Sequence, residues 1–400
     1  MILIVSAIFP PEPVVSANLS FDIANALCKK EKVTVLSPFP TRPFGKVYKS
    51  KEIYKNYPFE HTILKSYTSP KSSLLGRFRE SYSLGIHTKK YIEENYHHIE
   101  VIYANTWPLF AQKYLVEVAS KYNIPVVLHI QDIYPESISE KIPFLGFLVQ
   151  KLLFPMDNII LKKSTEIITI SSKMKNYLME SRYLKENKIK VIRNWQNDDI
   201  FINYKDKHQN NNKFTFMYLG SINPTAGVDL LINAFGESNL KEARLIIAGS
   251  GSDKEKCIKI AKSHHDKTIE FHEVSGKEVP NMQSKADVLL LPLKKGVART
   301  ALPSKLTAYM LSAKPIIASI DLDSEPADMI RDNTCGFVIE PENKSQLIKC
   351  MENITKLRKE KLLSMGENSS IYAKEHLSKR HNLSKLTTII QNTKREITNA

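Results

Sequence analysis

A short loop in the second half of the chain, residues 294–304, combines basic side chains with hydroxyl groups. It lies between two apolar runs that are typical of buried parallel strands, Val288–Leu291 and Pro315–Ala318, and a helical pattern begins where it ends. Such a loop places free backbone N–H groups and the positive end of a helix at the mouth of a sheet, where phosphate groups bind. Arg299 in the loop and Lys305 in the first helical turn can donate charge-assisted hydrogen bonds to a diphosphate. We therefore predict a phosphate-binding site here.

Four further positions could contribute chemistry, and each also has a structural interpretation. Asp132 follows the predicted strand Val126–Ile130, and its carboxylate could accept a proton or bind a hydroxyl, or it could cap a helix. Glu12 lies in the turn after the first predicted strand and could face either a cleft or solvent. Gly249 and Gly251 follow another strand, where they allow either a tight turn or the close approach of a ligand.

Four more candidates lie near predicted element ends. Gly220 follows the strand predicted over residues 214–219, and Ser304 stands at the start of the helix that carries Lys305. Asn194 precedes a polar segment, where it could shape a hinge or contact a ligand. Glu325 could accept a hydrogen bond from a sugar hydroxyl.

The composition indicates a globular protein with two domains. The chain has 400 residues, of which 42% are hydrophobic, and this is too long for one ordinary core. The net charge is +15, and residues 1–195 hold 27 Lys and Arg against 17 Asp and Glu. A basic first half favours anionic partners such as phosphorylated substrates, anionic membranes or nucleic acid. The four cysteines are widely separated, which indicates reduced thiols in the cytosol and no zinc site.

Apolar strands alternate with helical patterns in both halves, which predicts an α/β fold. The first turn lacks the GxGxxG pattern of dinucleotide-binding enzymes, so a nicotinamide oxidoreductase is disfavoured. An Asn-, Asp- and Lys-rich stretch marks the boundary. We predict a first domain over residues 1–198, a linker over 199–212, a second domain over 213–378, and a final helix over 379–400 that could pack back on the first domain.

The segment Ile142–Lys163 is the most apolar in the chain. Polar residues interrupt it, so it is too short to span a bilayer. It could be a core helix or an interfacial helix with Phe144, Leu148 and Phe154 in the membrane surface and flanking lysines near the lipid headgroups. The mixed aromatic and basic residues between 41 and 96 leave a similar choice between a packed amphipathic helix and a surface that faces a membrane or an acceptor.

Several motifs together resemble the retaining, family 4 type of GT-B glycosyltransferase over nearly the whole chain. They read, in order, VIRNWQNDDIF, YLGSINPTAGVDLLINAF, LIIAGSGSDKEK, KADVLLLPLK and AKPIIAS. The segments QDIYPES and PSKLTAYM are similar to the branch that makes bacterial O-antigen and capsule, including transferases of N-acetylated 6-deoxyhexosamines such as N-acetylfucosamine. The resemblance implies two Rossmann-like, doubly wound domains that face each other across a cleft.

The resemblance also implies an activity and its partners. The donor would be a nucleotide diphosphate-sugar, with UDP as the expected nucleotide, and the acceptor an undecaprenyl diphosphate-linked saccharide. No cofactor and no metal are expected, and the protein would lie on the cytoplasmic face of the inner membrane. Arg299 and Lys305 would bind the leaving diphosphate, Asp132 would serve the acceptor, and Asn194 and Glu325 would contact substrate.

Departures from the family pattern keep other functions open. The two positions that usually carry glutamate are Thr300 and Ala308, and the usual basic residues of the second-domain glycine turn fall on Ser221 and Ala226. The histidine often found after a first-domain strand is replaced by Gln131. The alternatives are a GT-B protein that binds a nucleotide-sugar without transferring it, an epimerase of the same fold, and a basic nucleic-acid-binding protein.

Overall fold

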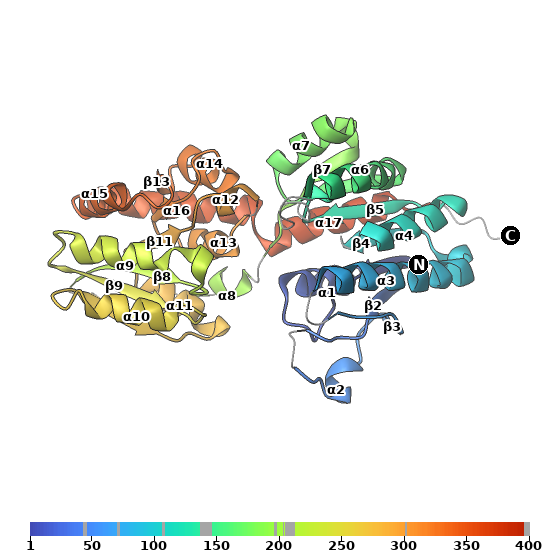
Figure 1. Ribbon diagram of the computed structural model, residues 1–400, viewed down its shortest axis with the longest axis horizontal. Coiled ribbons are helices and arrows are strands. Elements are labelled where there is room, and N and C mark those ends of the chain that lie inside the picture. Colours follow the sequence, from blue (N-terminus) through green and yellow to red (C-terminus); the bar gives the residue numbers. More distant parts are fainter. Residues whose placement is uncertain are drawn as a thin grey trace. The chain divides into compact units, whose positions relative to one another are not determined.

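The computed structural model describes residues 1–42, 46–69, 73–105, 109–136, 146–195, 198–202, 204, 213–300 and 302–395. The chain forms two compact units, each built around a parallel sheet (Figure 1). The first unit comprises residues 1–194 together with the C-terminal residues from Asn382 onward, and the second comprises Trp195–His381.

The first unit contains a seven-stranded sheet in the order β3-β2-β1-β4-β5-β6-β7. Its strands are β1 (Ile2–Ser6), β2 (Val33–Pro38), β3 (Glu60–Leu64), β4 (Val101–Asn105), β5 (Val126–Ile130), β6 (Glu166–Thr169) and β7 (Ile189–Val191). All neighbouring strands are parallel, and β1, β4 and β5 are buried along their whole length. The strand order reverses between β1 and β4, which creates a switch point at their carboxyl ends.

Helices cover the sheet of the first unit. They are α1 (Val15–Leu27), α2 (Ser50–Ile53), α3 (Leu74–Asn95), α4 (Leu109–Lys121), α6 (Gly146–Lys163), α7 (Ser172–Arg182) and most of α17 (Lys379–Asn392), with short 3₁₀ turns at Tyr96–His98 and Glu186–Lys188. Apolar side chains of α3, α4, α6 and α7 form one core with alternate strand residues, such as Leu3, Ile102 and Leu128. This arrangement explains why the strands read as continuous apolar runs.

The second unit contains a six-stranded parallel sheet in the order β10-β9-β8-β11-β12-β13. Its strands are β8 (Phe214–Leu219), β9 (Ala243–Ala248), β10 (Thr268–His272), β11 (Val288–Pro292), β12 (Ile316–Ser319) and β13 (Gly336–Ile339). Its helices are α8 (Asp199–Ile202), α9 (Val228–Glu237), α10 (Lys254–Lys262), α11 (Val279–Ser284), α12 (Val297–Thr300), α13 (Ser304–Leu311), α14 (Glu325–Asp332), α15 (Lys344–Ile354) and α16 (Lys359–His376), with 3₁₀ turns at Pro224–Ala226 and Gly276–Glu278. Separate cores form on the two faces of the sheet.

The predicted fold class, two Rossmann-like α/β domains, is confirmed, with local differences. The first helix begins at Val15, soon after the proline-containing turn that follows β1. The irregular stretch after Thr41 contains the edge strand β3, whose partly exposed residues do not form an apolar run. Within the predicted linker 199–212, the described residues include α8, because Phe201 packs into the core of the second unit.

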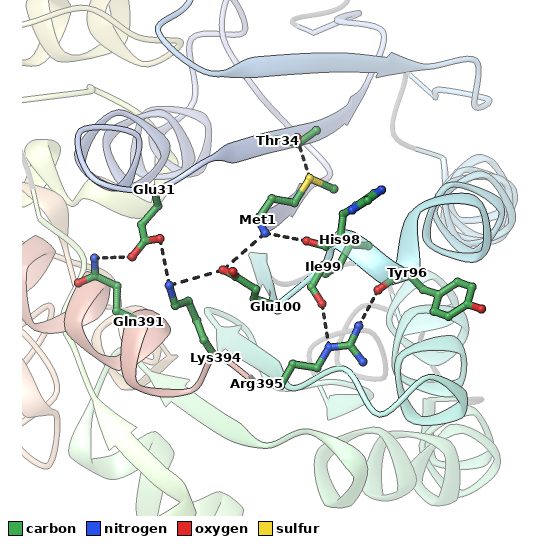
Figure 2. A network of polar contacts seen from close by, with 10 residues as sticks. All are labelled: Met1, Glu31, Thr34, Tyr96, His98, Ile99, Glu100, Gln391, Lys394 and Arg395. Carbon is green, nitrogen blue, oxygen red and sulfur yellow. Dashed lines mark hydrogen bonds and ion pairs between the residues drawn. The ribbon is translucent and has the colours of Figure 1, made fainter. Parts of the chain in front are cut away.

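The C-terminal segment is tied to the first unit by a polar network around Met1 (Figure 2). Lys394 lies 3.0 Å from Glu31 and 3.5 Å from Glu100. The guanidinium of Arg395 donates to three backbone carbonyls, those of Tyr96, Ile99 and Tyr122, at 2.5 to 2.9 Å. These carbonyls follow helices α3 and α4, so Arg395 caps two helix ends at once.

We expect Arg395→Ala to lower the free energy of unfolding of the first unit by about 2 kcal/mol, because the carbonyls lose charge-assisted hydrogen bonds. Urea unfolding followed by circular dichroism measures this change. Lys385→Ala removes an exposed charge from α17 and is the matched control. Equal stability of Arg395→Ala and the wild type would contradict this role.

Candidate functional site

In the second unit, the loops after β8 and β9 interlock through their backbones. The N–H of Gly220 donates to Ala248 at 2.9 Å, and the N–H of Ile222 donates to Ser250 at 2.8 Å. A Cβ atom on Gly249 would lie 2.0 Å from the carbonyl oxygen of Gly220, and one on Gly251 would lie 2.1 Å from that of Ile222. Any side chain at these two positions would therefore clash with the backbone of the neighbouring loop, which accounts for glycine within the turn itself.

Lys305 lies against this glycine turn. It is the second residue of α13, and a Cβ atom on Gly220 would lie 2.2 Å from its Cε atom. Its Nζ atom donates to the hydroxyl of Tyr218 at 2.6 Å. Burial lowers the pKa of Lys305 to about 8, because a low-dielectric site disfavours the charged amine. In the described part of the chain it forms no ion pair, so its charge is not balanced by a carboxylate.

We predict that the nucleotide binding expected from the family resemblance depends on the protonation of Lys305. The ammonium form dominates below about pH 8 and is lost above it, so the affinity for UDP should fall several-fold between pH 7 and pH 9. Isothermal titration calorimetry at both pH values measures the change, and Lys305→Met should bind UDP weakly with little pH dependence. An affinity that is constant over this range in the wild type would contradict a contact between Lys305 and phosphate.

The loop after β11 turns at Gly296, where the N–H of Val297 donates to the carbonyl oxygen of Lys294 at 3.2 Å. The N–H of Gly296 donates to both carboxylate oxygens of Asp321 at 2.9 Å, with φ at +88°. Arg299 lies in α12 and Ser304 begins α13, but their side chains are outside the described structure. Ala308, at a position where glutamate is usual, is buried in the core, so the site has a methyl group there in place of a carboxylate.

Two other predicted residues occupy element ends. Glu325 is the first residue of α14, where a carboxylate is favoured by the helix dipole, and Ser324 caps that helix. Asn194 ends the first unit, and its Oδ1 atom is buried with no hydrogen-bond partner among the described residues. A buried amide oxygen of this kind needs a hydrogen-bond donor from a ligand or water.

In the first unit, a pocket of about 170 Å³ lies at the carboxyl ends of the sheet strands, at the switch point between β1 and β4. Asn105 ends β4, and its amide donates to Ser20 at 2.8 Å and accepts from Gln131 at 2.7 Å. Asp132 is exposed beside Gln131 and lines the same pocket. The lining residues are Ser6, Ala7, Ile8, Ser16, Pro38, Arg42, Arg77, Glu80, Leu84, Asn105, Gln131 and Asp132.

Sequence reasoning named Asp132, which lines this pocket, but it did not name Arg42, Arg77 and Glu80, which line it as well. These residues lie in the stretch whose pattern was irregular, and only the folding of α3 beside the loop after β2 brings them together. The sequence offered one indication of this cluster, the close spacing of Arg77 and Arg79 before Glu80.

Glu12 lies beside the pocket but does not line it. It is buried, and its Oε1 atom accepts the backbone N–H groups of Thr41 and Arg42, each at 2.7 Å. Burial raises its pKa despite these hydrogen bonds. Glu12 is therefore not exposed to solvent, and its carboxylate fixes the loop after β2.

Arg182, the last residue of α7, forms hydrogen bonds with the loop that carries Asp132. This side chain is fully buried, and it donates to Glu136 at 2.9 Å, to Asp157 at 2.8 Å and to the carbonyl of Tyr134 at 2.9 Å. Burial raises the pKa of Asp157 to about 6. Arg182 thus connects α6 and α7 to the connection after β5.

Two family models match consecutive parts of the chain. Residues 17–199 match the model described as "Glycosyltransferase Family 4", and residues 200–371 match "Glycosyl transferases group 1". No curated protein matches the chain. Among the described residues, no cluster of three or more His, Cys, Asp or Glu could hold a metal ion, and no helix is long and apolar enough to cross a membrane.

Solved structures share the fold at low sequence identity. HepE from Anabaena in complex with UDP has 15% identity and a TM-score of 0.67, with 98% of this chain and 99% of that chain covered. WaaG, a glycosyltransferase involved in lipopolysaccharide biosynthesis, has 16% identity and a TM-score of 0.66 with the same coverage. Sucrose-phosphate synthase from Thermosynechococcus elongatus has 12% identity and a TM-score of 0.68, again with 98% and 99% covered.

Proposed function

We propose that this chain, a GT-B glycosyltransferase of the group 1 and family 4 type, transfers a sugar from a nucleotide diphosphate-sugar to a lipid-linked saccharide. The nucleotide of the donor is UDP. The sugar is a hexose or an N-acetylated or deoxy hexose, its anomeric configuration is retained, and the product enters bacterial O-antigen or capsule. The observation that carries the proposal is the buried amine of Lys305 beside the Gly220 turn, at the carboxyl end of β8.

In the proposed reaction, the bond between the anomeric carbon and the diphosphate breaks while a bond to the acceptor oxygen forms, and the proton of the acceptor hydroxyl passes to the leaving diphosphate. The leaving diphosphate gains negative charge, which the ammonium of Lys305 stabilises together with Arg299 and the N–H groups at the start of α13. The acceptor binds in the first-unit pocket, where Asp132 accepts a hydrogen bond from its hydroxyl. The proposal includes no cofactor and no metal.

The test is to incubate the protein with UDP-, GDP- and dTDP-sugars and a short lipid-linked acceptor while nucleotide release is followed. Release that requires acceptor supports transfer. Donor binding without turnover would support a protein that binds sugar nucleotides without transferring the sugar. Consumption of UDP-sugar without acceptor would support an epimerase, and salt-dependent DNA binding would support a nucleic-acid-binding protein. Any of these three results without transfer would overturn the proposal.

Helix α6 suggests how the enzyme reaches a lipid-linked acceptor. Its inner face contributes Leu153, Ile160 and Leu161 to the core, whereas Leu148 and Leu152 are 57% and 77% exposed. Phe147 and Ile159 are also exposed, as are the lysines at 151, 162 and 163. An apolar stripe with flanking lysines fits the surface of an anionic bilayer, and we propose that α6 lies in the cytoplasmic face of the inner membrane.

We expect the double variant Leu148→Ser/Leu152→Ser to bind anionic phosphatidylglycerol vesicles at least roughly tenfold more weakly, because two leucines no longer enter the lipid. Vesicle sedimentation measures the bound fraction. The control is Leu363→Ser/Ile371→Ser, which removes exposed apolar residues from α16. Equal binding of the α6 variant and the wild type would rule out the interfacial helix.

Two residues expected at this surface are unsuitable as probes of membrane binding. Phe144 lies outside the described residues. Phe154 packs against the guanidinium of Arg182, 4.1 Å from its ring centre, so the expectation that it enters the membrane surface is wrong. Its substitution would disturb the Arg182 cluster.

A further inference from the structure

We propose that Arg42 and Arg77 bind a phosphate group of the acceptor in the first-unit pocket. This inference rests on the proposed function, because that function makes the first unit the acceptor-binding unit. It assigns to the pocket a ligand class, a phosphate ester or diphosphate next to the acceptor sugar, and it makes the two arginines determinants of acceptor specificity.

The charges in the pocket favour an anion. Arg42 and Arg77 come from the loop after β2 and from α3, and both pair with Glu80, at 2.5 Å and 3.2 Å. The Glu80 side chain is only 6% exposed. Among the residues that line the pocket, two guanidinium groups thus share one buried carboxylate. Asp132, the other carboxylate in the lining, is exposed, so solvent screens its charge.

Arg42, which lines this pocket, has an unused donor. Its Nε atom is buried and has no hydrogen-bond partner among the described residues, whereas its Nη2 atom binds Glu80. A buried donor without an acceptor is costly, and the cost is larger for a charged group. A phosphate oxygen would supply the missing acceptor. Guanidinium groups suit this ligand because their N–H groups match the spacing of phosphate oxygens.

The backbone of Arg42 is fixed before any ligand binds. Glu12 accepts its N–H and that of Thr41, and the hydroxyl of Tyr48 donates to its carbonyl oxygen. Little conformational freedom of the backbone is then lost when an anion binds. Glu12 is thus a positioning residue for Arg42. This accounts for a buried carboxylate at the edge of a pocket that it does not line.

The rest of the lining suits a sugar attached to that phosphate. Ser6, Ser16, Asn105 and Gln131 offer hydroxyl and amide groups that can bind sugar hydroxyls. The arginines lie on α3 and the loop after β2, and the amides lie at the ends of β4 and β5. One pocket therefore presents a charged part and an uncharged polar part, as a phosphorylated sugar requires.

The test is calorimetric titration of the full chain with inorganic pyrophosphate and with farnesyl diphosphate. It is done in the Lys305→Met/Arg299→Met background, so that the two side chains expected to contact phosphate in the second unit do not contribute. Arg42→Gln and Arg77→Gln should each weaken binding of both probes at least tenfold. Glu80→Gln should strengthen binding, because it removes the competing carboxylate, and a misfolded protein could not produce this gain. Arg79→Gln removes an exposed charge from the same helix and should have no effect.

Tighter binding of farnesyl diphosphate than of pyrophosphate supports a lipid-linked acceptor, whereas equal binding supports a phosphate site and overturns the lipid source. Unchanged affinity in Arg42→Gln and Arg77→Gln, with no gain in Glu80→Gln, overturns the proposal. The proposed function is judged separately by acceptor-dependent nucleotide release. If the enzyme is active and neither arginine substitution changes its KM for the acceptor, this phosphate site is refuted but the proposed function is not. If no sugar donor gives nucleotide release, sugar transfer is refuted, and the titrations still test phosphate binding.

Discussion

Lys305→Ala should reduce acceptor-dependent nucleotide release at least roughly tenfold, which corresponds to about 1.4 kcal/mol of activation free energy. The amine of Lys305 lies beside the Gly220 turn, and its partners in the described part of the chain are neutral groups of Tyr218 and Ser221. Its charge is therefore available for an anion that develops in the transition state, when the diphosphate leaves. Arg299→Ala should lower release by a similar factor.

Measuring kcat and KM for the Lys305→Ala variant distinguishes two roles of this residue, stabilisation of the transition state and binding of the donor. A lower kcat at saturating donor indicates that the ammonium stabilises the leaving diphosphate, whereas a raised KM alone indicates equal binding of substrate and transition state. Lys349→Ala is the matched control, because it removes an exposed lysine from α15 of the same unit. Wild-type rates in both Lys305→Ala and Arg299→Ala would exclude the assigned phosphate contacts.

The fold was predictable because its strands are covered on both faces. Runs such as Leu289–Leu291 in β11 are completely buried, so they stand out in the sequence as uninterrupted apolar stretches. The edge strand β3 was missed for the opposite reason. It pairs only with β2, and Glu60 to Ile63 remain partly or fully exposed, so its composition resembles that of a loop.

The candidate site was less predictable because its residues meet only through tertiary structure. Lys305 could be chosen from its place at a helix start, a local feature. Arg42 and Arg77 are 35 positions apart, and nothing local links them to Glu12 or Asp132. Gly249 illustrates the same limit, because the carbonyl that excludes a side chain there belongs to another loop.

The second large effect is expected at Arg182. Arg182→Met should lower the free energy of unfolding of the first unit by about 3–5 kcal/mol, because it leaves the carboxylates of Asp157 and Glu136 without their buried counter-charge. Methionine retains much of the volume over Phe154, so the loss is mainly electrostatic. Urea unfolding at pH 7 measures it. Arg331→Met, which removes an exposed arginine paired with Asp328, should cost less than about 1 kcal/mol.

The pH dependence of the Arg182→Met variant tests this cause. The native pKa of Asp157 is about 6, above the ordinary value of 3.8, so the folded state already binds its proton more readily than the unfolded state. Without Arg182, the pKa of Asp157 should rise further and the lowered pKa of Glu136 should rise as well, so the folded variant should gain stability relative to wild type as the pH falls from 7 to 5. The double variant Arg182→Met/Asp157→Asn should recover part of the loss at pH 7. A deficit that is the same at both pH values, and is not reduced by Asp157→Asn, would indicate lost packing as the cause and would exclude unpaired charge.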